Sequence, residues 1–353
     1  MIRLALLFGG QSAEHSVSCV TALGVFSAID KTKYEVVPVG ITKDGRFTIQ
    51  QVSPDWTLAD NPEVAMTDEV FIPLGAGSWR TASGKDLGVI DIVFPVLHGP
   101  NGEDGSVQGL LQLSSVAYVG NGVLASALAM EKSKAKAVFR DAGLKVADDL
   151  VALESEYQRN PQAFLNACKD RFDLPVFVKP SRSGSSVGVS KVKSFDDLAE
   201  AIRYAFEFDN TVLVEQCVVG REVECAVLQH PNGELEVSKA GEIVVTGREF
   251  YDYEAKYLDG GADLLVPTSL SDSELEQMHE LAKRAFNALG CTGLARTDFF
   301  LTKDGFVLTE VNTMPGFTPI SMYPSLWQAT GVSYPELVET LIQTGLALGT
   351  KPR

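Results

Sequence analysis

Short apolar runs that end in glycine-rich or polar turns open the chain. Ile2–Phe8 is mostly apolar and runs into Gly9-Gly10, a pattern that predicts a buried strand followed by a tight turn. A helix is predicted over 17–29, a second strand over 36–41, and a third over 90–96, just before the turn 98–102. Strands and helices in this order are typical of a doubly wound α/β domain, which binds ligands at the C-terminal ends of its strands.

Two further parts are expected after this first domain, which we place at residues 1–124. The second part spans 125–214, and the third spans 215–353. Helices are predicted over 130–142, 198–206, 272–289 and 334–348, and strands over 175–179, 212–215 and 222–228. A polar segment rich in aromatic residues, 246–261, interrupts the third part.

Two strand-like runs around Thr302–Gly305 predict a β-hairpin with acidic residues on it. If the loop has three residues, 303–305, Asp298 lies opposite Glu310 and Arg296 opposite Asn312, and all four side chains share one face. Two carboxylates about 5 Å apart repel each other, so a cation between them is expected. Carboxylate and amide oxygens suit Mg²⁺ that bridges nucleotide phosphates. The alternative is a solvated polar face, with a two-residue turn that separates the two acids.

A second constellation is typical of phosphate binding. The strand 175–179 delivers Lys179 to the start of the loop 181–188, which is rich in glycine and serine. Small residues let backbone N–H groups converge on an anion, although a serine-rich surface turn would have the same composition. Lys132 could be a second phosphate contact, but a helical lysine by itself is more often simply solvated.

Charge and cysteine usage exclude several classes of protein. The net charge is −16 and no basic run stands out, so a nucleic-acid partner is not expected. The five cysteines are scattered without a C-x-x-C pair, which argues against a zinc site or a disulfide framework and fits a reducing cytosol. The apolar opening is too short for a signal peptide or a membrane span. We therefore expect a cytoplasmic protein that does not bind membranes.

Six motifs, in order along nearly the whole chain, carry a resemblance to a known family. They are GGQSAEHSVS (9–18), LHGPNGEDG (97–105), VKPSRSGSSVGVSKV (178–192), FYDYEAKY (250–257), ARTDFF (295–300) and EVNTMPGFTPISMYP (310–324). With them the sequence resembles the D-alanine–D-alanine ligases of the ATP-grasp superfamily. The resemblance implies an α/β ATP-grasp fold that follows a Rossmann-like N-terminal domain.

The activity that the resemblance implies is the ATP-dependent ligation of two D-alanines for peptidoglycan precursor synthesis. ATP phosphorylates the carboxylate of the first D-alanine, and the amine of the second attacks the acyl phosphate through a tetrahedral intermediate. The products are D-alanyl-D-alanine, ADP and phosphate. The cofactors implied are two Mg²⁺ or Mn²⁺ ions, and members of the family are often homodimers through the N-terminal domain.

The resemblance also implies a nucleotide site between the second and third parts. Its ATP-binding residues would be Lys132, Lys179, Ser186, Glu215, Val218, Glu222, Phe250 and Lys256. Glu215 and Val218 would meet adenine, Glu222 the ribose, and Phe250 would cover the base. Asp298, Glu310 and Asn312 would hold the metal ions. Segment 246–261 would be a lid over the acyl phosphate, excluding the water that would hydrolyse it.

For the amino acids, the resemblance places Glu14 at the ammonium of the first D-alanine and His98 near its carboxylate. A lone glutamate or histidine after a strand is usually a solvated or packed loop residue, so the resemblance alone carries these two roles. Arg296 and the Gly316 amide would stabilise the tetrahedral oxyanion. Ser321 and Met322 would contact the second D-alanine. Tyr257 would join Ser185 and Glu14 in a bridge from the lid to the N-terminal domain.

Three alternatives stay open. The complete YDYEAKY pattern favours an amine over a hydroxyl acid as the nucleophile, but a D-Ala–D-Ser ligase remains possible because one extra hydroxyl is hard to exclude. A different ATP-grasp ligase would share the lysines and the hairpin without a reason to keep GGQSAEHSVS or the lid motif. A non-catalytic nucleotide-binding regulator would be expected to lose one of the hairpin residues, all of which are present.

Overall fold

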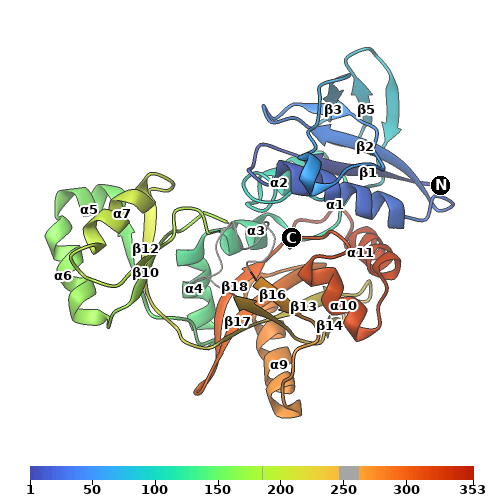
Figure 1. Ribbon diagram of the computed structural model, residues 1–353. Coiled ribbons are helices and arrows are strands. Elements are labelled where there is room, and N and C mark those ends of the chain that lie inside the picture. The colour runs from blue at the N-terminus through green and yellow to red at the C-terminus, as the bar shows by residue number, and fades with distance from the viewer. Residues whose placement is uncertain (185, 246–261) are drawn as a thin grey trace.

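The computed structural model describes residues 1–184, 186–245 and 262–353, which form three large sheets and a small one (Figure 1). The helices are α1 (His15–Ala28), η1 (Leu58–Asp60), α2 (Ser106–Leu113), α3 (Val123–Met130), α4 (Lys132–Asp141), α5 (Glu154–Arg159), α6 (Pro161–Arg171), α7 (Leu198–Phe206), α9 (Asp272–Leu289), α10 (Met322–Thr330) and α11 (Tyr334–Leu348). None of these described helices is long and apolar enough to cross a membrane.

The N-terminal sheet has the order β3-β2-β1-β7-β8, formed by β1 (Ile2–Gly9), β2 (Tyr34–Ile41), β3 (Phe47–Ile49), β7 (Ile92–Pro95) and β8 (Ala117–Tyr118). All of its pairings are parallel except that of β2 with β3. Leu4 and Leu6 of β1 share a core with α1 and α11, whereas Ala5 and Leu7 share one with α2. Because side chains alternate along a strand, helices cover both faces, as expected for a doubly wound sheet.

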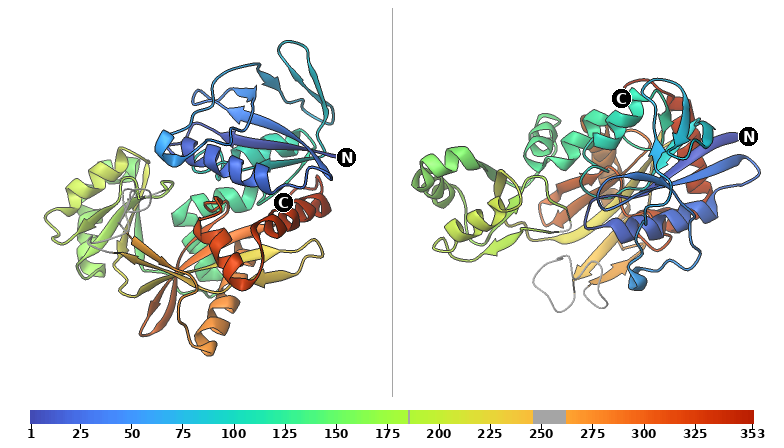
Figure 2. Two further views of the ribbon diagram at one scale, coloured as in Figure 1. Left: turned by 45° about the vertical axis from the view of Figure 1, so that its right-hand side comes forward. Right: turned by 90° about the horizontal axis from the view of Figure 1, so that it is seen from above.

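The second sheet is antiparallel and has a core of its own. Its order is β11-β10-β12-β9, formed by β9 (Asp149–Leu153), β10 (Val176–Pro180), β11 (Ser190–Val192) and β12 (Thr211–Gln216). Val176, Val178, Val212 and Val214 alternate along β10 and β12 and pack against α6 and α7. In Figure 2 this sheet and its helices stand apart at one end of the molecule.

The third sheet is also antiparallel and is covered on both faces. Its order is β16-β15-β13-β17-β18, with β14 beside β13, and it comprises β13 (Arg221–Gln229), β14 (Leu235–Val237), β15 (Gly241–Val245), β16 (Ala262–Leu265), β17 (Leu294–Thr302) and β18 (Gly305–Asn312). Val223 and Val227 pack on α9, together with side chains of α3 and α4. Ala226 and Leu228 of β13 face the opposite way, towards α10.

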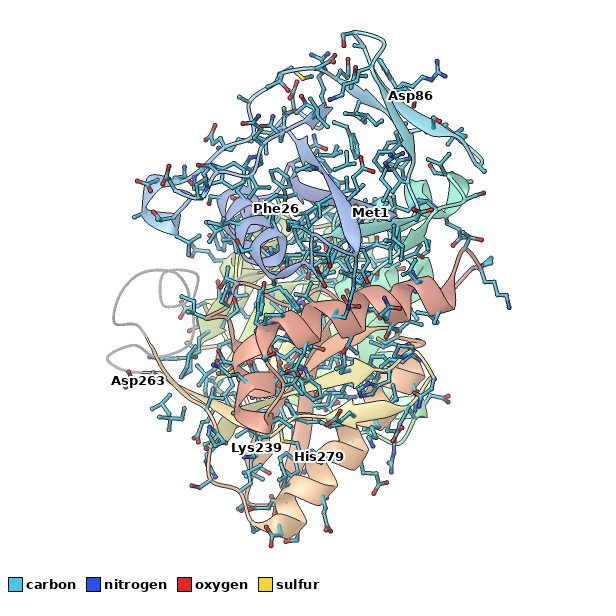
Figure 3. The ribbon with its side chains drawn as sticks, turned by 90° about the vertical axis from the view of Figure 1, so that its right-hand side faces the viewer. Met1, Phe26, Asp86, Lys239, Asp263 and His279 are labelled. Carbon is cyan, nitrogen blue, oxygen red and sulfur yellow. The ribbon has the colours of Figure 1, made fainter. Side chains whose placement is uncertain are left out.

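Helix α11 joins the third sheet to the N-terminal sheet. Leu337, Leu341 and Ile342 belong to one buried cluster that contains β1 side chains on one side and β13 side chains on the other. Figure 3 shows this helix between the part that carries Met1 and Phe26 and the part that carries Lys239 and His279. The small sheet of β4 (Val70–Phe71), β5 (Ser78–Thr81) and β6 (Asp86–Val89) extends from the N-terminal part.

A comparison of the predicted and observed helices shows which helix ends local sequence signals are sufficient to predict. The predictions over 272–289 and 334–348 coincide with α9 and α11, each of which begins with a serine–glutamate capping box. The helix predicted over 130–142 is present as α4, but it begins at Lys132, because the backbone leaves the helical region at Glu131, between α3 and α4. Lys132 is therefore the first residue of a helix rather than an interior one.

The hairpin of β17 and β18 pairs the residues as predicted, but by a different route. Asp298 lies opposite Glu310 and Arg296 opposite Asn312. The predicted three-residue loop was wrong: Thr302 pairs with Gly305, so the turn has two residues. A β-bulge after Asp298 leaves Thr309 unpaired and shifts the register by one residue, which returns both acids to the same face.

Candidate active site

A cavity of about 520 Å³ lies where the three large sheets meet. Most of the site residues expected from the sequence line it: Glu14, His98, Lys132, Lys179, Ser186, Glu215, Val218, Glu222, Arg296, Glu310, Asn312, Gly316, Ser321 and Met322. Asp298 does not line the cavity directly but contacts two residues that do, Arg296 and Asn312. Side chains from distant parts of the sequence thus converge on one concave site.

The phosphate-binding loop and Lys132 lie together, although about fifty residues separate them in the sequence. The Lys132 ammonium donates to the carbonyl oxygen of Ser183 at 2.8 Å, and its backbone N–H donates to that of Ser181 at 3.0 Å. The same ammonium lies 3.7 Å from Glu310 on β18. The lysine therefore connects the loop after β10 to the acidic face of the hairpin.

Glu215 on β12 is the counter-ion of two lysines. Lys179 and Lys136 each place their ammonium 2.8 Å from its oxygen Oε2. Burial alone would raise the pKa of Glu215, but Lys179 and Lys136 outweigh it, so the pKa is lowered. The pKa of Lys179 is raised because Glu215 outweighs the effect of its burial. Both groups are ionised at neutral pH.

On the acidic face of the hairpin, Arg296 and Asn312 hold Asp298. Arg296 donates to both carboxylate oxygens, at 2.8 and 2.7 Å, and the Asn312 amide donates to Oδ2 at 2.8 Å. Arg296 also lies 3.0 Å from Glu224, the residue opposite Asp298 on β13. Burial would lower the pKa of Arg296, but Asp298 and Glu224 raise it well above its usual value. The guanidinium is permanently charged.

The donor set of this face fits a hard cation that is shared with a ligand. Asp298 and Glu310 supply carboxylates, and the amide oxygen of Asn312 points away from the donor that contacts Asp298. Within the described ranges no group of three or more His, Cys, Asp or Glu side chains could hold a metal. Two carboxylates and an amide are the ligands of an ion that takes its remaining oxygens from phosphates and water, as Mg²⁺ does.

Glu14 and His98 reach the cavity from the C-terminal ends of β1 and β7. Glu14 precedes α1, and a Cβ atom on Gly99 would lie 3.2 Å from its oxygen Oε2. His98 is buried; its Nδ1 lies 3.2 Å from the carbonyl of Met314 and its Nε2 3.3 Å from the Thr21 hydroxyl. Burial lowers the pKa of His98, so the imidazole is neutral, donates from Nδ1 and accepts at Nε2.

Glu103 is a third titratable group at this end of the cavity, and the sequence reasoning gave it no role. It lines the cavity and accepts a hydrogen bond from the Gly99 backbone at 2.7 Å. Burial and the nearby Glu14 raise its pKa to about 8. Its position inside the motif LHGPNGEDG was the available signal. The Glu103 carboxyl group, whose pKa lies above neutral pH, is therefore close to Glu14 at this end of the cavity.

The segment after β18 brings Gly316, Ser321 and Met322 to the same cavity. Ser321 is the N-cap of α10, but its hydroxyl interacts with the Thr318 side chain at 2.7 Å and does not cap the helix. A Cβ atom on Gly316 would lie 3.3 Å from that hydroxyl. Met322 is buried in the core beneath. The first turn of α10 thus presents backbone N–H groups, which favour an anion.

Two more charged residues escaped the sequence reasoning. Lys136 lies one helical turn after Lys132 on α4, and Glu224 lies two residues after Glu222 on β13. No local sequence pattern indicates their roles, because each depends on a tertiary contact. Lys136 forms an ion pair with Glu215 of β12, and Glu224 lies opposite Asp298 of β17. Four predicted residues, Ser185, Phe250, Lys256 and Tyr257, lie outside the described residues, as does the predicted lid.

Comparison with known proteins connects this geometry to a family. The sequence model for the D-ala D-ala ligase N-terminus matches residues 3–121, and the model for the D-ala D-ala ligase C-terminus matches residues 138–343. The chain belongs to the D-Ala–D-Ala ligase family. The D-alanine–D-alanine ligase of Mycolicibacterium vanbaalenii is 48% identical to it, over 99% of the chain and 98% of the relative. That of Mycobacterium tuberculosis is 46% identical, over 99% and 96%.

Solved structures of other D-Ala–D-Ala ligase family members have the same fold. The VanG D-Ala:D-Ser ligase from Enterococcus faecalis superimposes with a TM-score of 0.87 at 34% identity, over 98% of this chain and 99% of that one. The D-alanine–D-alanine ligase from Coxiella burnetii gives 0.78 at 33% identity, over 98% and 94%. The prediction of an α/β ATP-grasp fold with a doubly wound N-terminal part is confirmed.

Proposed function

We propose that this protein is an ATP-dependent D-alanine–D-alanine ligase. The observation that carries the proposal is that one cavity joins three kinds of group. Lys132 and Lys179 mark a phosphate site, Arg296 and the hairpin acids a site for developing charge, and Glu14 and His98 an amino-acid site. Relatives 45–48% identical over nearly the full chain bear the same name. ATP and D-alanine are the substrates.

At the nucleotide site, Lys132 and Lys179 bind phosphate oxygens, and the loop carrying Ser186 supplies backbone donors. Glu215 and Val218 meet the base and Glu222 the ribose. Lys132 supports this assignment because it already contacts the loop at Ser183, 2.8 Å away. A phosphate placed there is within reach of both the loop and the hairpin.

Asp298, Glu310 and Asn312 would hold Mg²⁺, or Mn²⁺, as two ions. When bound, the ions neutralise phosphate charge and polarise the transferred phosphoryl group. The support is the all-oxygen donor set opposite Lys132, with Asn312 oriented so that its amide oxygen is not turned towards Asp298. Arg296, which lies beside these residues, then balances the charge that develops on the substrate.

The amino acids bind at the N-terminal end of the cavity. Glu14 takes the ammonium of the first D-alanine and His98 lies near its carboxylate. The γ-phosphoryl group passes from ATP to a carboxylate oxygen of the first D-alanine, which releases ADP. The neutral amine of the second D-alanine attacks the acyl carbon and gives up a proton. Arg296 and the Gly316 amide stabilise the oxyanion of the tetrahedral intermediate, from which phosphate leaves. Ser321 and Met322 position the second D-alanine.

Four residues keep the roles that the resemblance implies: Ser185 and Tyr257 form the bridge with Glu14, Phe250 covers the base and Lys256 contacts the phosphate. Segment 246–261 is the lid. We also propose three working parts, 1–124, 125–214 and 215–353, which the three large sheets support. A cytoplasmic location, where ATP is supplied, belongs to the same proposal.

A homodimer through the N-terminal part belongs to the same proposal. Phe71, Leu74 and Leu113 expose 55%, 74% and 67% of their surface, and the hydrogen bond from the Gly75 N–H to the Leu113 carbonyl brings two of them together. Exposed apolar side chains that gather on one face are typical of an association surface. Sedimentation analysis of the wild type and of Leu113→Asp tests it, since a dimer through this face dissociates in the variant.

The experiment that tests the activity supplies the purified protein with ATP, Mg²⁺ and D-alanine and measures phosphate and dipeptide. Equal amounts of phosphate and D-alanyl-D-alanine are expected, with no turnover on L-alanine. Arg296→Met is expected to reduce turnover by about a hundredfold or more, as loss of an oxyanion donor does. Protein that binds ATP but forms no dipeptide from any D-amino acid would contradict the ligase assignment.

A D-Ala–D-Ser ligase is the second candidate, favoured by the likeness to the Enterococcus faecalis enzyme. Mixtures of D-alanine with D-serine or D-lactate distinguish the two. A mixed dipeptide that forms faster than D-alanyl-D-alanine at equal concentrations would reassign the second substrate and leave the ATP chemistry unchanged.

A further inference from the structure

Lys136 is a buried charged residue for which the proposed reaction has no use. Only 4% of its surface is exposed, yet its ammonium lies 2.8 Å from Glu215 and 3.1 Å from Asp149. A buried lysine is retained only when its charge is matched, because taking an ammonium out of water costs several kcal/mol. Here two carboxylates match it, and one of them lines the nucleotide cavity.

Lys136 in turn offsets the repulsion between the two carboxylates. Glu215 and Asp149 are directly opposite each other on the antiparallel strands β12 and β9. Like charges in that position repel. Lys136 contacts both, and Arg140, one helical turn later on α4, contacts Asp149 from outside. The result is a chain of alternating charges, Arg140–Asp149–Lys136–Glu215, that leads from the surface to the cavity.

Lys179 is the last charged group of this chain at the cavity end, and it is the one that can leave Glu215 to bind a phosphate. With Lys179 the five groups carry one net positive charge, and without it the other four are neutral. When Lys179 turns to a phosphate, Glu215 therefore keeps a cation at its oxygen Oε2. The glutamate stays ionised and fixed in place during nucleotide binding.

The second oxygen of Glu215 is available to a ligand. Both lysines contact Oε2, and Oε1 makes no hydrogen bond with any residue in the described ranges. An ionised carboxylate only accepts hydrogen bonds. Oε1 therefore selects an N–H donor on the base, such as the exocyclic amine of adenine, and disfavours a carbonyl oxygen at the same place.

We propose that Lys136 is a positioning residue that sets nucleobase specificity, by keeping Glu215 oriented as an acceptor towards the base while Lys179 binds phosphate. The inference rests on the proposed function, in which ATP occupies this cavity. Without Lys136, Glu215 faces Asp149 with no cation between them. The O–H of a protonated Glu215 donates to the carbonyl oxygen of hypoxanthine, and its other oxygen accepts from the amine of adenine, so the two bases are no longer distinguished.

The test compares ATP with inosine triphosphate, whose base has a carbonyl oxygen in place of the exocyclic amine. Dissociation constants for both nucleotides are measured without D-alanine, in the wild type, Lys136→Met and Lys136→Arg. The preference for ATP is expected to fall about 10- to 100-fold in Lys136→Met, the worth of a hydrogen bond to a charged group. Lys136→Arg keeps the cation and is expected to retain most of the preference.

Lys134→Met is the matched control, because Lys134 is an exposed lysine on the same helix. It is expected to leave both dissociation constants unchanged. If both nucleotides weaken equally in Lys136→Met, Lys136 is only structural and the proposal is overturned. If Lys136→Met does not fold, Lys136→Arg and Asp149→Asn decide: Asp149→Asn keeps Lys136 on Glu215 and is expected to preserve the ATP preference, and a preference lost there counts against the proposal.

Binding and turnover separate this inference from the proposed function. A protein that prefers ATP through Lys136 but makes no dipeptide contradicts the ligase assignment and leaves the role of Lys136 intact. A ligase whose ATP preference is unchanged in folded Lys136→Met contradicts the inference alone.

Discussion

Arg296 donates to both carboxylate oxygens of Asp298, two residues further along the same strand, at 2.8 and 2.7 Å. The residue proposed to bind a metal is therefore held by the residue proposed to bind the oxyanion. The guanidinium is held in turn by Glu224, 3.0 Å away on β13. Charge balance at this face is shared between one arginine and the carboxylates around it, so any added cation acts on Arg296 as well.

Removing the arginine should change cation affinity as well as turnover. Arg296→Met removes a positive charge from the cation site and both hydrogen bonds that Arg296 donates to Asp298, leaving the one from the Asn312 amide. Two unit charges 4 Å apart interact by about 1 kcal/mol in bulk water and about 4 kcal/mol near a protein surface. Because Mn²⁺ carries two charges, it should bind at least about tenfold more tightly. Electron paramagnetic resonance of free Mn²⁺, without nucleotide, measures this.

The control is Arg221→Met on β13, whose guanidinium pairs with Glu242 away from the cavity. It should leave Mn²⁺ affinity unchanged. Unaltered Mn²⁺ binding in Arg296→Met would show that Asp298 is not part of the cation site.

Glu14→Gln should weaken the binding of the first D-alanine without affecting the binding of ATP. The substitution keeps the shape of the side chain but removes the charge that pairs with an ammonium. Hydrogen bonds to charged groups are worth about 1.5–3 kcal/mol, so KM for D-alanine should rise about 10- to 100-fold. KM for ATP should stay within about twofold. Glu35→Gln, at a half-exposed position of β2, is the control, and a parallel rise in KM for ATP would argue against the assignment.

Glu103 should make the protein less stable as pH rises. Its pKa is about 8 in the folded state against 4.5 ordinarily, so between these values the folded state holds a proton that the unfolded state releases. The free energy of unfolding therefore falls with pH in this window, by about 1.4 kcal/mol per pH unit from this group. Below pH 4.5 the effect is absent, and above pH 8 it is complete.

Glu103→Gln should remove this dependence. Urea unfolding at pH 5, 6.5 and 8 should show the variant gaining stability relative to the wild type as pH increases. Glu276→Gln, on an exposed part of α9, should show no such trend. Parallel pH profiles for wild type and Glu103→Gln would mean that Glu103 is ionised in the folded protein.

Both the backbone conformation at Gly9 and the lack of space around it require glycine at this position. Its φ is 91°, and a Cβ atom there would lie 2.4 Å from the carbonyl oxygen of Ile41 on the neighbouring strand. Gly9→Ala should cost about 2–5 kcal/mol from the left-handed backbone and overpacking together. Gly75→Ala is the matched comparison, since its φ is 74° with nothing within 4 Å. Thermal unfolding of both variants separates the two causes, and equal losses would contradict the clash.

The sequence predicts helices and strands best where the signal is local. The capping serine and glutamate of α9 and the glycine that follows it fix both ends of that helix. No comparable signal marks the break at Glu131, where Lys132 is held by the loop after β10 instead. The prediction missed this boundary because the contact that holds the first residue of α4 comes from the loop about fifty positions away.

The candidate site was predictable in its residue types and less so in its geometry. The pairing of Asp298 with Glu310 was predicted from a loop of the wrong length, and only the bulge at Thr309 makes it correct. Lys136 was not found, because its partners Asp149 and Glu215 become neighbours only when β9 pairs with β12. Tertiary pairing, rather than any run of sequence, creates that charge chain.

The buried cluster around α11 determines which segments of the chain can be replaced by the corresponding segments of a relative. The second sheet has a hydrophobic core of its own, so a segment from β9 to β12 taken from another ligase would bring its own interior, provided that the polar contacts with Lys132, Lys136 and Arg140 of α4 are kept. The N-terminal sheet and the third sheet share Leu341 and Ile342 of α11. These two regions therefore have to come from the same parent. A chimaera that joined them from two parents would place unmatched side chains in the shared core.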